Sequence, residues 1–541
     1  MLVQRLFVNA TFYTQWPQQP IATALLTRGE RIVALGAAEE IRAHATGPVE
    51  TVDLGGAFVS PGFNDAHIHA AEYAREITAL DIRESRSLEE ALAGVSSYAS
   101  SLPADAWIFG GRWDYNTWTV PTQPDRYVLD HASGGRPAAL PSIDGHTIWA
   151  NSAALAAVGI TRDTPDPVGG EIVRDAQGEP TGILRETAGD SLAAIMNSPA
   201  AGDLGQQLKE GQKRLLATGL TSIHCFDGED ARAAYRKLYD DGALHLRVHK
   251  SIPVTSLDLA IDEGRATGHG DHWLSTGPVK LFSDGALGSH TCHMNQEFPG
   301  ENGNTGIEVI PFAELSALVR KGASAGIGVA THAIGDRANQ LVLDAYQELF
   351  ENPLDPNLNA VSNGATQLRH RIEHTQHLRP QDVARLASLG VVPSMQPTHC
   401  TTDIPLASTL LADHDLASYA WRSLTDAGAV LAFGSDAPIE APDPLYGIHA
   451  AVTRQNKDNA PDGGWQPRER LSVAEAIAGF TTGPAYASGE EAIKGRLRPG
   501  MLADFVALEH NPFDINPSQL RHLKVKATIV GGDIKYWNET L

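Results

Sequence analysis

The chain has 541 residues, of which 42% are hydrophobic, and it carries a formal net charge of -23 at pH 7. The apolar content excludes a disordered chain, and the acidic excess argues against nucleic acids and anionic membranes as partners. Its cysteines, Cys225, Cys292 and Cys400, are too few and too widely spaced for a disulfide framework. No signal peptide or membrane span is evident, so we expect a cytoplasmic protein with a small-molecule substrate, and a homodimer remains open.

Short strands with glycine-rich or charged turns are predicted at both ends of the chain. They cover residues 2–12, 22–27, 31–35 and 50–54 near the start, and 503–508, 527–530 and 534–537 near the end. Neither set alone is long enough to bury the face of a sheet. We therefore expect residues 1–56 and 490–541 to pair in one small composite β domain.

Between the two ends, short apolar runs alternate with amphipathic stretches, which is typical of parallel βα units. Eight strands are predicted, at residues 57–63, 221–226, 246–252, 279–282, 328–332, 371–375, 391–396 and 430–434. Helices are predicted at residues 311–325, 339–349, 380–389 and 472–480. Eight parallel strands favour an α/β protein built on a closed (β/α)₈ TIM barrel, formed by residues 57–72 and 206–489.

The connection between the first two predicted strands is far longer than the roughly 30 residues of a βα unit. Residues 73–205 are therefore predicted to be an insertion, with hairpin-like sequence at residues 169–178. Because the insertion leaves the barrel after its first strand, we expect it to form a lid over the C-terminal face, where TIM barrels carry their active sites.

The first candidate site lies at the end of the first barrel strand. His67 and His69 are two residues apart, so on an extended chain their imidazoles face the same way and can share a metal ion. Alone, this pair is weak evidence, since two loop histidines would give the same pattern.

Three further strands end in residues that can bind a metal. His332 follows the fifth strand, His374 the sixth and Asp436 the eighth. In a barrel these positions converge on one face, which is difficult to explain by core packing. Imidazoles with a carboxylate favour a divalent metal, most simply zinc, with iron or manganese as alternatives.

Lys280 stands inside an apolar strand, where an unpaired cation is costly to bury. It could pair with Asp284, or its ammonium could reach solvent. A carbamate formed with carbon dioxide would instead be anionic and could bridge two metals. The residues alone leave these alternatives open.

These segments resemble the amidohydrolase superfamily, specifically its YtcJ-like branch (the amidohydrolase 3 type), over essentially the whole chain. The matching motifs are residues 60–69, 279–286, 332–336, 371–374, 434–438 and 495–505. The resemblance implies a (β/α)₈ barrel with a β-sandwich built from both chain ends. It also implies one metal on His67 and His69, a second on His332 and His374, and Lys280 as a carboxylated bridge. Asp436 would be both a metal ligand and the general base.

Three residues are candidates for substrate binding. His290 stands where the family commonly has arginine, which puts an arginine contact there in doubt. His146, in the insertion, could reach the substrate or make a structural hydrogen bond. Trp113 could line an apolar pocket or pack in a core.

The predicted activity is hydrolysis of a carbon–nitrogen bond in an amide or cyclic amide, such as an N-substituted amide or formamide, by metal-activated hydroxide. Asp436 would move the proton from water to the leaving nitrogen. Ester or lactone cleavage would use the same groups. The rivals from other classes are a non-hydrolytic metal enzyme, such as a decarboxylase or isomerase, and an inactive regulatory or binding protein, which would require lost ligands.

Overall fold

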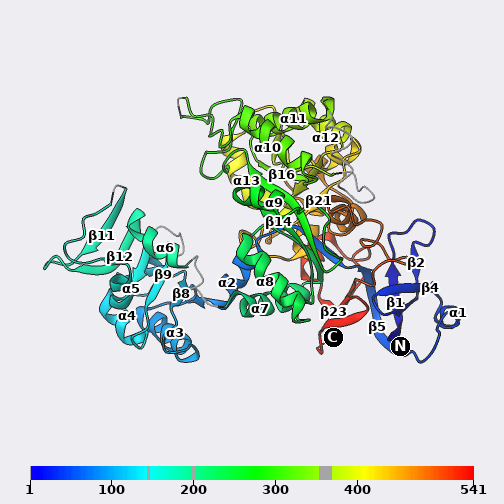
Figure 1. Cartoon of the computed structure of the whole chain (residues 1–541), viewed down its shortest axis with the longest axis horizontal. Helices are drawn as coiled ribbons and strands as arrows, with labels where there is room; N and C mark the ends of the chain where they lie inside the picture. Colours follow the sequence, from blue (N-terminus) through cyan, green and yellow to red (C-terminus); the bar gives the residue numbers. More distant parts are fainter. Residues whose placement is uncertain are drawn as a thin grey trace. The chain divides into compact units, whose positions relative to one another are not determined.

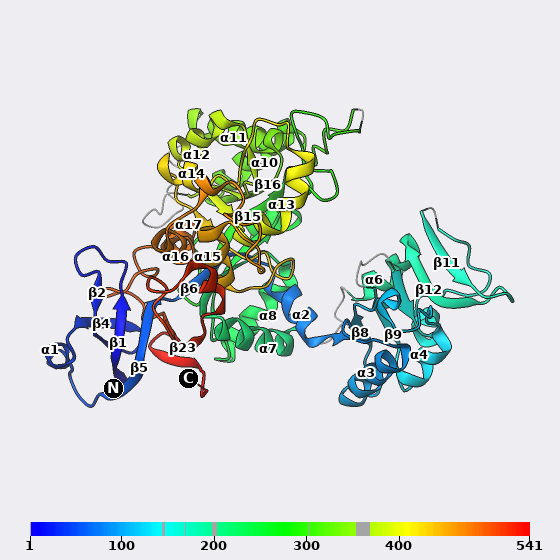
Figure 2. The ribbon, with the colours of Figure 1, turned by 180° about the vertical axis from the view of Figure 1, so that it is seen from behind.

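The protein is described here by a computed structural model that covers residues 2–142, 147–167, 169–196, 203–301, 303–352 and 368–540. The chain divides into two compact units, and Figures 1 and 2 view it from opposite sides. One unit combines Met1–Ala70 with Gly211–Leu541, and the other is the inserted stretch Ala71–Glu210. Within the described residues, no helix has both the length and the apolar character needed to cross a membrane.

The first unit contains a sheet of eight parallel strands in the order β6, β13, β14, β15, β16, β17, β19 and β21. In that order they are Phe63–Ile68, Leu220–Cys225, Arg247–Pro253, Leu274–Phe282, Val329–Ala333, Arg371–His374, Val392–Met395 and Ala432–Phe433. The chain beyond β21 returns to β6, where the Asp436 N–H donates to the His67 carbonyl (2.7 Å) and the His69 N–H to the Ala437 carbonyl (2.9 Å). The predicted (β/α)₈ barrel is confirmed.

Helices follow the strands, and Figure 1 shows α10, α11 and α12 outside β16. The helices of this unit are α8 (Glu229–Asp240), α9 (Leu257–Asp262), α10 (Phe312–Ser324), α11 (Asp336–Glu351), α12 (Val383–Leu389), α13 (Pro397–Leu410), α14 (Trp421–Asp426), α15 (Pro444–Thr453), α16 (Val473–Gly479) and α17 (Thr482–Ala487), with α7 (Leu204–Ala217) at the unit boundary and a small α1 (Ala38–Arg42). α11 buries Ala338, Val342 and Ala345 at helical spacing. The four predicted helices correspond to α10, α11, α12 and α16.

The prediction was wrong about the first barrel strand. Residues 57–61 belong to β5 (Glu50–Pro61), which pairs in the other sheet, and the barrel strand is β6. The whole stretch from Ala57 to Ile68 is buried, so its hydrophobicity does not mark where one sheet ends. The break is at Gly62, where an added Cβ would lie 2.3 Å from the hydroxyl of Thr221.

Strands from both chain ends share the second sheet of this unit, in the order β24, β23, β22, β5, β1, β3, β4, with β2 paired to β1. From the start come β1 (Gln4–Tyr13), β2 (Ile21–Ala22), β3 (Ala24–Arg28), β4 (Arg31–Gly36) and β5, and from the end β22 (Phe505–Leu508), β23 (Val525–Val530) and β24 (Asp533–Trp537). Phe7 and Phe505 meet edge-to-face with ring centroids 4.9 Å apart. Aromatic packing therefore joins the two ends in one core.

The inserted unit has its own sheet, in the order β11, β12, β10, β9, β8, β7. Its strands are β7 (Leu80–Asp81), β8 (Ile108–Gly111), β9 (Ala138–Pro141), β10 (Thr147–Ala150), β11 (Gly170–Arg174) and β12 (Pro180–Glu186). Its helices are α2 (Ala70–Thr78), α3 (Leu88–Ser101), α4 (Arg126–Ala132), α5 (Ser152–Ala157) and α6 (Asp190–Met196). The predicted hairpin is present as the antiparallel pair β11 and β12. That this unit covers the barrel mouth stays a prediction.

Candidate metal centre

The residues predicted from the strand ends come together at one end of the barrel. His67 ends β6 and Lys280 lies near the end of β15, while His332 and His374 lie at the ends of β16 and β17. The β16–β17 register sets His332 opposite Glu373 and Ala333 opposite His374. In parallel strands such positions share one edge of the sheet, and here that edge closes into the barrel mouth.

One group that can hold a metal consists of His67, His69 and Asp436, whose ligand atoms all lie within 4.8 Å of one another. Nε2 of His67 is 3.4 Å and Nε2 of His69 is 3.5 Å from Oδ1 of Asp436. Two imidazoles and a carboxylate at these separations fit the ligand set of a divalent metal, with further positions left for water or substrate.

A second group uses the other oxygen of the same carboxylate. It consists of His374, His399 and Asp436, with Nε2 of His399 3.8 Å from Oδ2 of Asp436. The rings of His374 and His399 are nearly parallel, with centroids 6.0 Å apart. Asp436 therefore stands between two groups of histidines.

His332, the expected partner of His374, lies beside it with ring centroids 4.5 Å apart. Its Nε2, however, is 3.1 Å from the Gly285 carbonyl and 3.4 Å from Asp284. His399 is the residue that sequence reasoning missed. It comes three residues after the seventh predicted strand, in the first turn of α13. The other candidates were found by searching for metal-binding residues where a strand ends, and that search finds His399 only if it also includes the first turn of the following helix.

The inner nitrogens of two histidines are held by other side chains. Nδ1 of His67 is 2.6 Å from Oε2 of Glu373, and Nδ1 of His374 is 2.8 Å from Oε1 of Gln396. Arg371, fully buried, donates to Glu373 and to the Ala66 carbonyl. Such partners fix the ring orientation and leave Nε2 free to bind a metal.

The backbone at the site is strained at two positions. His374 has φ of 74° and Asp436 has φ of 59°, a region that non-glycine residues seldom occupy. Asp436 is held there by its N–H bond to the His67 carbonyl. Backbone strain of this kind is concentrated at functional sites, where surrounding contacts maintain it.

The histidines of the site are neutral at physiological pH. Burial, reinforced by the charge of Lys280, lowers the pKa of His67 well below its usual value and that of His332 to about 3. Burial lowers the pKa of His374 strongly and that of His399 to about 4. Neutral imidazole is the form that binds a metal.

Lys280 is buried, and its Nζ lies 4.9 Å from the ring centroid of Phe226 and 5.0 Å from that of Phe282. Burial lowers the pKa of Lys280 to about 8, against the opposing charges of Glu373 and Asp436. The alternative partner, Asp284, accepts backbone N–H bonds from His293, Ile334 and Gly335. Within the described residues no ion pair joins Asp284 to Lys280.

The candidate substrate residues have separate surroundings. Trp113 is 2% exposed in the core of the inserted unit, where its indole N–H donates to the Leu140 carbonyl at 2.8 Å. This position fits the packing alternative. Nδ1 of His290 is bonded to Glu301, and its ring stacks on Phe298 at 5.1 Å. His146 lies outside the described residues. Substrate contacts by these three stay predictions.

Comparison with known proteins gives consistent matches. The chain matches the amidohydrolase family over residues 50–536. It is 32% identical to the putative amidohydrolase YtcJ of Bacillus subtilis over 97% of this chain and 98% of that one. It is 28% identical to the N-substituted formamide deformylase of Arthrobacter pascens, over 98% of both chains. A crystal structure of an uncharacterised metal-dependent hydrolase from Pyrococcus furiosus superposes with a TM-score of 0.78 at 26% identity, over 94% of this chain and 100% of that one. The chain therefore belongs to the amidohydrolase family, as a YtcJ-like member, and is a metal-dependent hydrolase of the kind that acts on carbon–nitrogen bonds.

Proposed function

We propose that the protein hydrolyses the carbon–nitrogen bond of an amide or cyclic amide, with N-substituted formamides as the substrate class to test first. The main support is the position of Asp436, whose Oδ1 faces His67 and His69 while its Oδ2 faces His399. A carboxylate between two groups of neutral imidazoles can both hold a metal and carry a proton. The relative from A. pascens that is named as a formamide deformylase supports the substrate class.

His67, His69 and Asp436 would hold one divalent ion, and His374 with His332 or His399 would hold a second. When bound, the metal lowers the pKa of a water molecule and polarises the substrate carbonyl. Zinc fits this ligand chemistry best, with iron and manganese as alternatives.

Lys280 would supply an anionic bridge. With a pKa of about 8, Lys280 is a free amine in a fraction of the protein molecules near neutral pH. The nitrogen of that neutral amine bonds to the carbon of carbon dioxide and releases one proton, which gives an anionic carbamate. The change also leaves no ammonium at this buried position.

Asp436 carries the proton in this proposal. It accepts a proton from the attacking water and donates it to the leaving nitrogen, so that the amine departs uncharged. Glu373 and Arg371 hold His67 in place meanwhile.

The test is incubation of the metal-loaded protein with N-alkylformamides and with the matching formate esters in ¹⁸O-labelled water. We expect amine release and ¹⁸O in the formate. Cleavage of the esters alone would favour the ester or lactone alternative. Decarboxylation or isomerisation products without ¹⁸O would show a non-hydrolytic enzyme and overturn the proposal.

We also propose a cytoplasmic location. Cys225, Cys292 and Cys400 are all buried and unpaired, as is usual for a protein of a reducing compartment. Fractionation of the source cells would test this directly, because recovery outside the cytosol would contradict it.

A further inference from the structure

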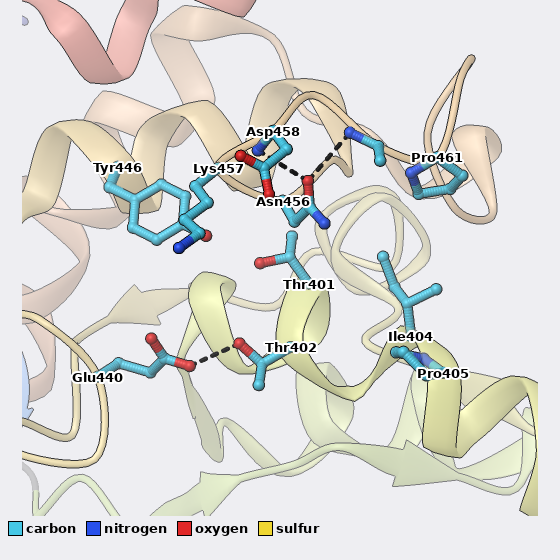
Figure 3. Close-up of a pocket in the computed structure, with 11 residues that line it drawn as sticks. Thr401, Thr402, Ile404, Pro405, Glu440, Tyr446, Asn456, Lys457, Asp458 and Pro461 are labelled. Carbon is cyan, nitrogen blue, oxygen red and sulfur yellow. Dashed lines mark hydrogen bonds between the residues drawn. The ribbon is translucent and has the colours of Figure 1, made fainter. Parts of the chain in front are cut away.

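A cavity of about 640 Å³ lies between helix α13 and the segment that follows α15 (Figure 3). Thr401, Thr402 and Ile404 of α13 form one wall. Tyr446 of α15 and Asn456 lie on the opposite wall. A volume of this size is within the range of small-molecule sites.

The cavity is linked to the metal centre through two chain segments, because α13 and the loop after β21 each carry a residue of both. His399 precedes Thr402 by three residues on α13, so both side chains lie on one face of the helix, about 4.5 Å apart along its axis. Glu440 follows Asp436 by four residues. The Thr402 hydroxyl donates to Oε1 of Glu440 at 2.6 Å, which joins the two elements. A substrate held at the metal centre would therefore extend a chain along α13 toward this cavity.

Glu440 is one of three charged side chains that line this cavity, together with Lys457 and Asp458. Its carboxylate is half-buried and, among the described residues, accepts one hydrogen bond, from Thr402. Burial raises the pKa of Glu440, and the charge of Asp403 raises it further, while the hydrogen bond from Thr402 lowers it. Lys457 lines the cavity but, in the part of the chain that the structure describes, forms no ion pair with Glu440. A partly desolvated carboxylate without a cationic partner gains more from a ligand cation than an exposed one does.

One end of the cavity suits an aliphatic chain. Ile404, Pro405 and Pro461 lie at the end of the cavity away from Glu440 in Figure 3. These side chains are apolar and would exclude water from methylene groups. The cavity thus offers the half-buried carboxylate of Glu440 on one side, the charged Lys457 and Asp458 on the opposite wall, and an apolar end.

We propose that this cavity is the subsite for the substituent on the substrate nitrogen, and that it takes an alkyl chain bearing an ammonium group, which Glu440 binds. The inference rests on the proposed amide hydrolysis and adds the class of amine to it. The net charge of -23 favours the approach of such cations.

The first test compares formamides of α,ω-diaminoalkanes, with two to six methylenes and one free ammonium, against neutral N-alkylformamides of equal length. For the parent protein, kcat/KM should favour the ammonium compounds and pass through an optimum length. Glu440→Gln should lower the ratio of kcat/KM for the two series by about 10- to 100-fold, the usual effect of losing one charged partner of a hydrogen-bonded pair. Glu440→Lys should reverse the preference.

The control is Glu348→Gln. Glu348 is also a carboxylate bonded to a hydroxyl, that of Ser316 at 2.7 Å, but it lies on α11 away from the cavity. The Glu348→Gln variant should leave both the activity and the ratio of kcat/KM for the two series unchanged. Equal metal content and melting temperature in all the variants would exclude a folding effect.

The second test is calorimetry of the metal-loaded protein with butylammonium and with butanol. Butylammonium should bind the parent and bind Glu440→Gln at least about tenfold more weakly, while butanol should not distinguish them. Binding of butylammonium that depends on Glu440, in a protein that cleaves no amide, would reject the proposed function and keep the subsite. Amide cleavage with no ammonium preference and no effect of Glu440→Gln would overturn the subsite alone.

Discussion

Nδ1 of His67 lies 2.6 Å from Oε2 of Glu373, and Arg371 donates to both oxygens of the same carboxylate. An ionised carboxylate only accepts hydrogen bonds, so Nδ1 of His67 carries the proton and Nε2 keeps its lone pair. That Nε2 is the atom 3.4 Å from Asp436. His67 is therefore fixed in the tautomer that a metal ligand needs.

Replacing Glu373 by Gln should weaken metal binding about 10- to 100-fold, because a neutral amide orients His67 less strongly than a carboxylate does. The melting temperature should also fall, since buried Arg371 loses its counter-ion. Competition with a chelator measures the affinity, and Glu348→Gln is the matched control. An unchanged metal affinity would show that Glu373 serves stability alone.

The purified protein should contain about one to two divalent ions per chain, measured by plasma emission. His67→Ala should lose metal and activity while remaining folded by circular dichroism. Comparing His332→Ala with His399→Ala identifies the partner of His374. We expect His399→Ala to lower the metal content, because its Nε2 lies within the group around Asp436. Full activity in a metal-free parent protein would contradict the metal centre itself.

Asp436→Asn should keep much of the metal and lower kcat by about 10²–10⁴-fold. The amide offers one oxygen to a metal but cannot be protonated at working pH. The acidic limb of the pH–rate profile should move or disappear in the residual activity. Near-normal turnover with full metal content would mean that another group carries the proton. His399 would be examined first, then His290 and His146.

Lys280→Ala should be inactive, and short-chain carboxylates such as acetate or propionate should restore part of its activity. The added carboxylate would replace the carbamate oxygens in the space the side chain leaves. Lys280→Arg is the comparison, because arginine fills the space and forms no carbamate under these conditions. Equal failure of rescue in both variants, with normal metal content, would argue against the bridge.

The stability of the metal-free protein should fall as the pH drops from about 6.5 to about 4. Burial lowers the pKa of both His249 and His370 to about 4. The unfolded chain, with a histidine pKa near 6.5, therefore binds more protons in that window. Urea unfolding at several pH values measures the slope. Each such histidine makes the unfolding constant change by about tenfold per pH unit within this window. His370→Leu should remove one such contribution from the slope, whereas replacing exposed His44 by Leu should leave the slope unchanged.

The strand pattern predicted the barrel and the edge at which His67, His332, His374 and Asp436 meet, because each apolar run ends where a polar ligand begins. It did not separate β5 from β6, since both sheets bury the same continuous stretch and only the close approach at Gly62 marks the boundary.

His399 was not predicted, because its position beside Asp436 depends on the direction in which α13 leaves the preceding strand. Hydrophobic periodicity does not encode that direction. The Glu440 cavity is likewise a property of packing between segments distant in sequence. The role of Glu373 could not be predicted from the sequence, because it depends on which nitrogen of His67 the carboxylate contacts.

The seam where the barrel closes passes through the metal centre. The Ser435 N–H donates to Asp65 across 370 residues of sequence. Across the same seam the Asp436 N–H donates to the His67 carbonyl and the His69 N–H donates to the Ala437 carbonyl. During synthesis, His67 and His69 emerge long before Asp436, the carboxylate that completes their group. The nascent chain therefore acquires its metal site only when the last barrel strand has been made. Metal uptake would then indicate that the barrel is complete. A chain truncated before Asp436 would lack both the hydrogen bonds that close the barrel and the carboxylate of the metal-binding group.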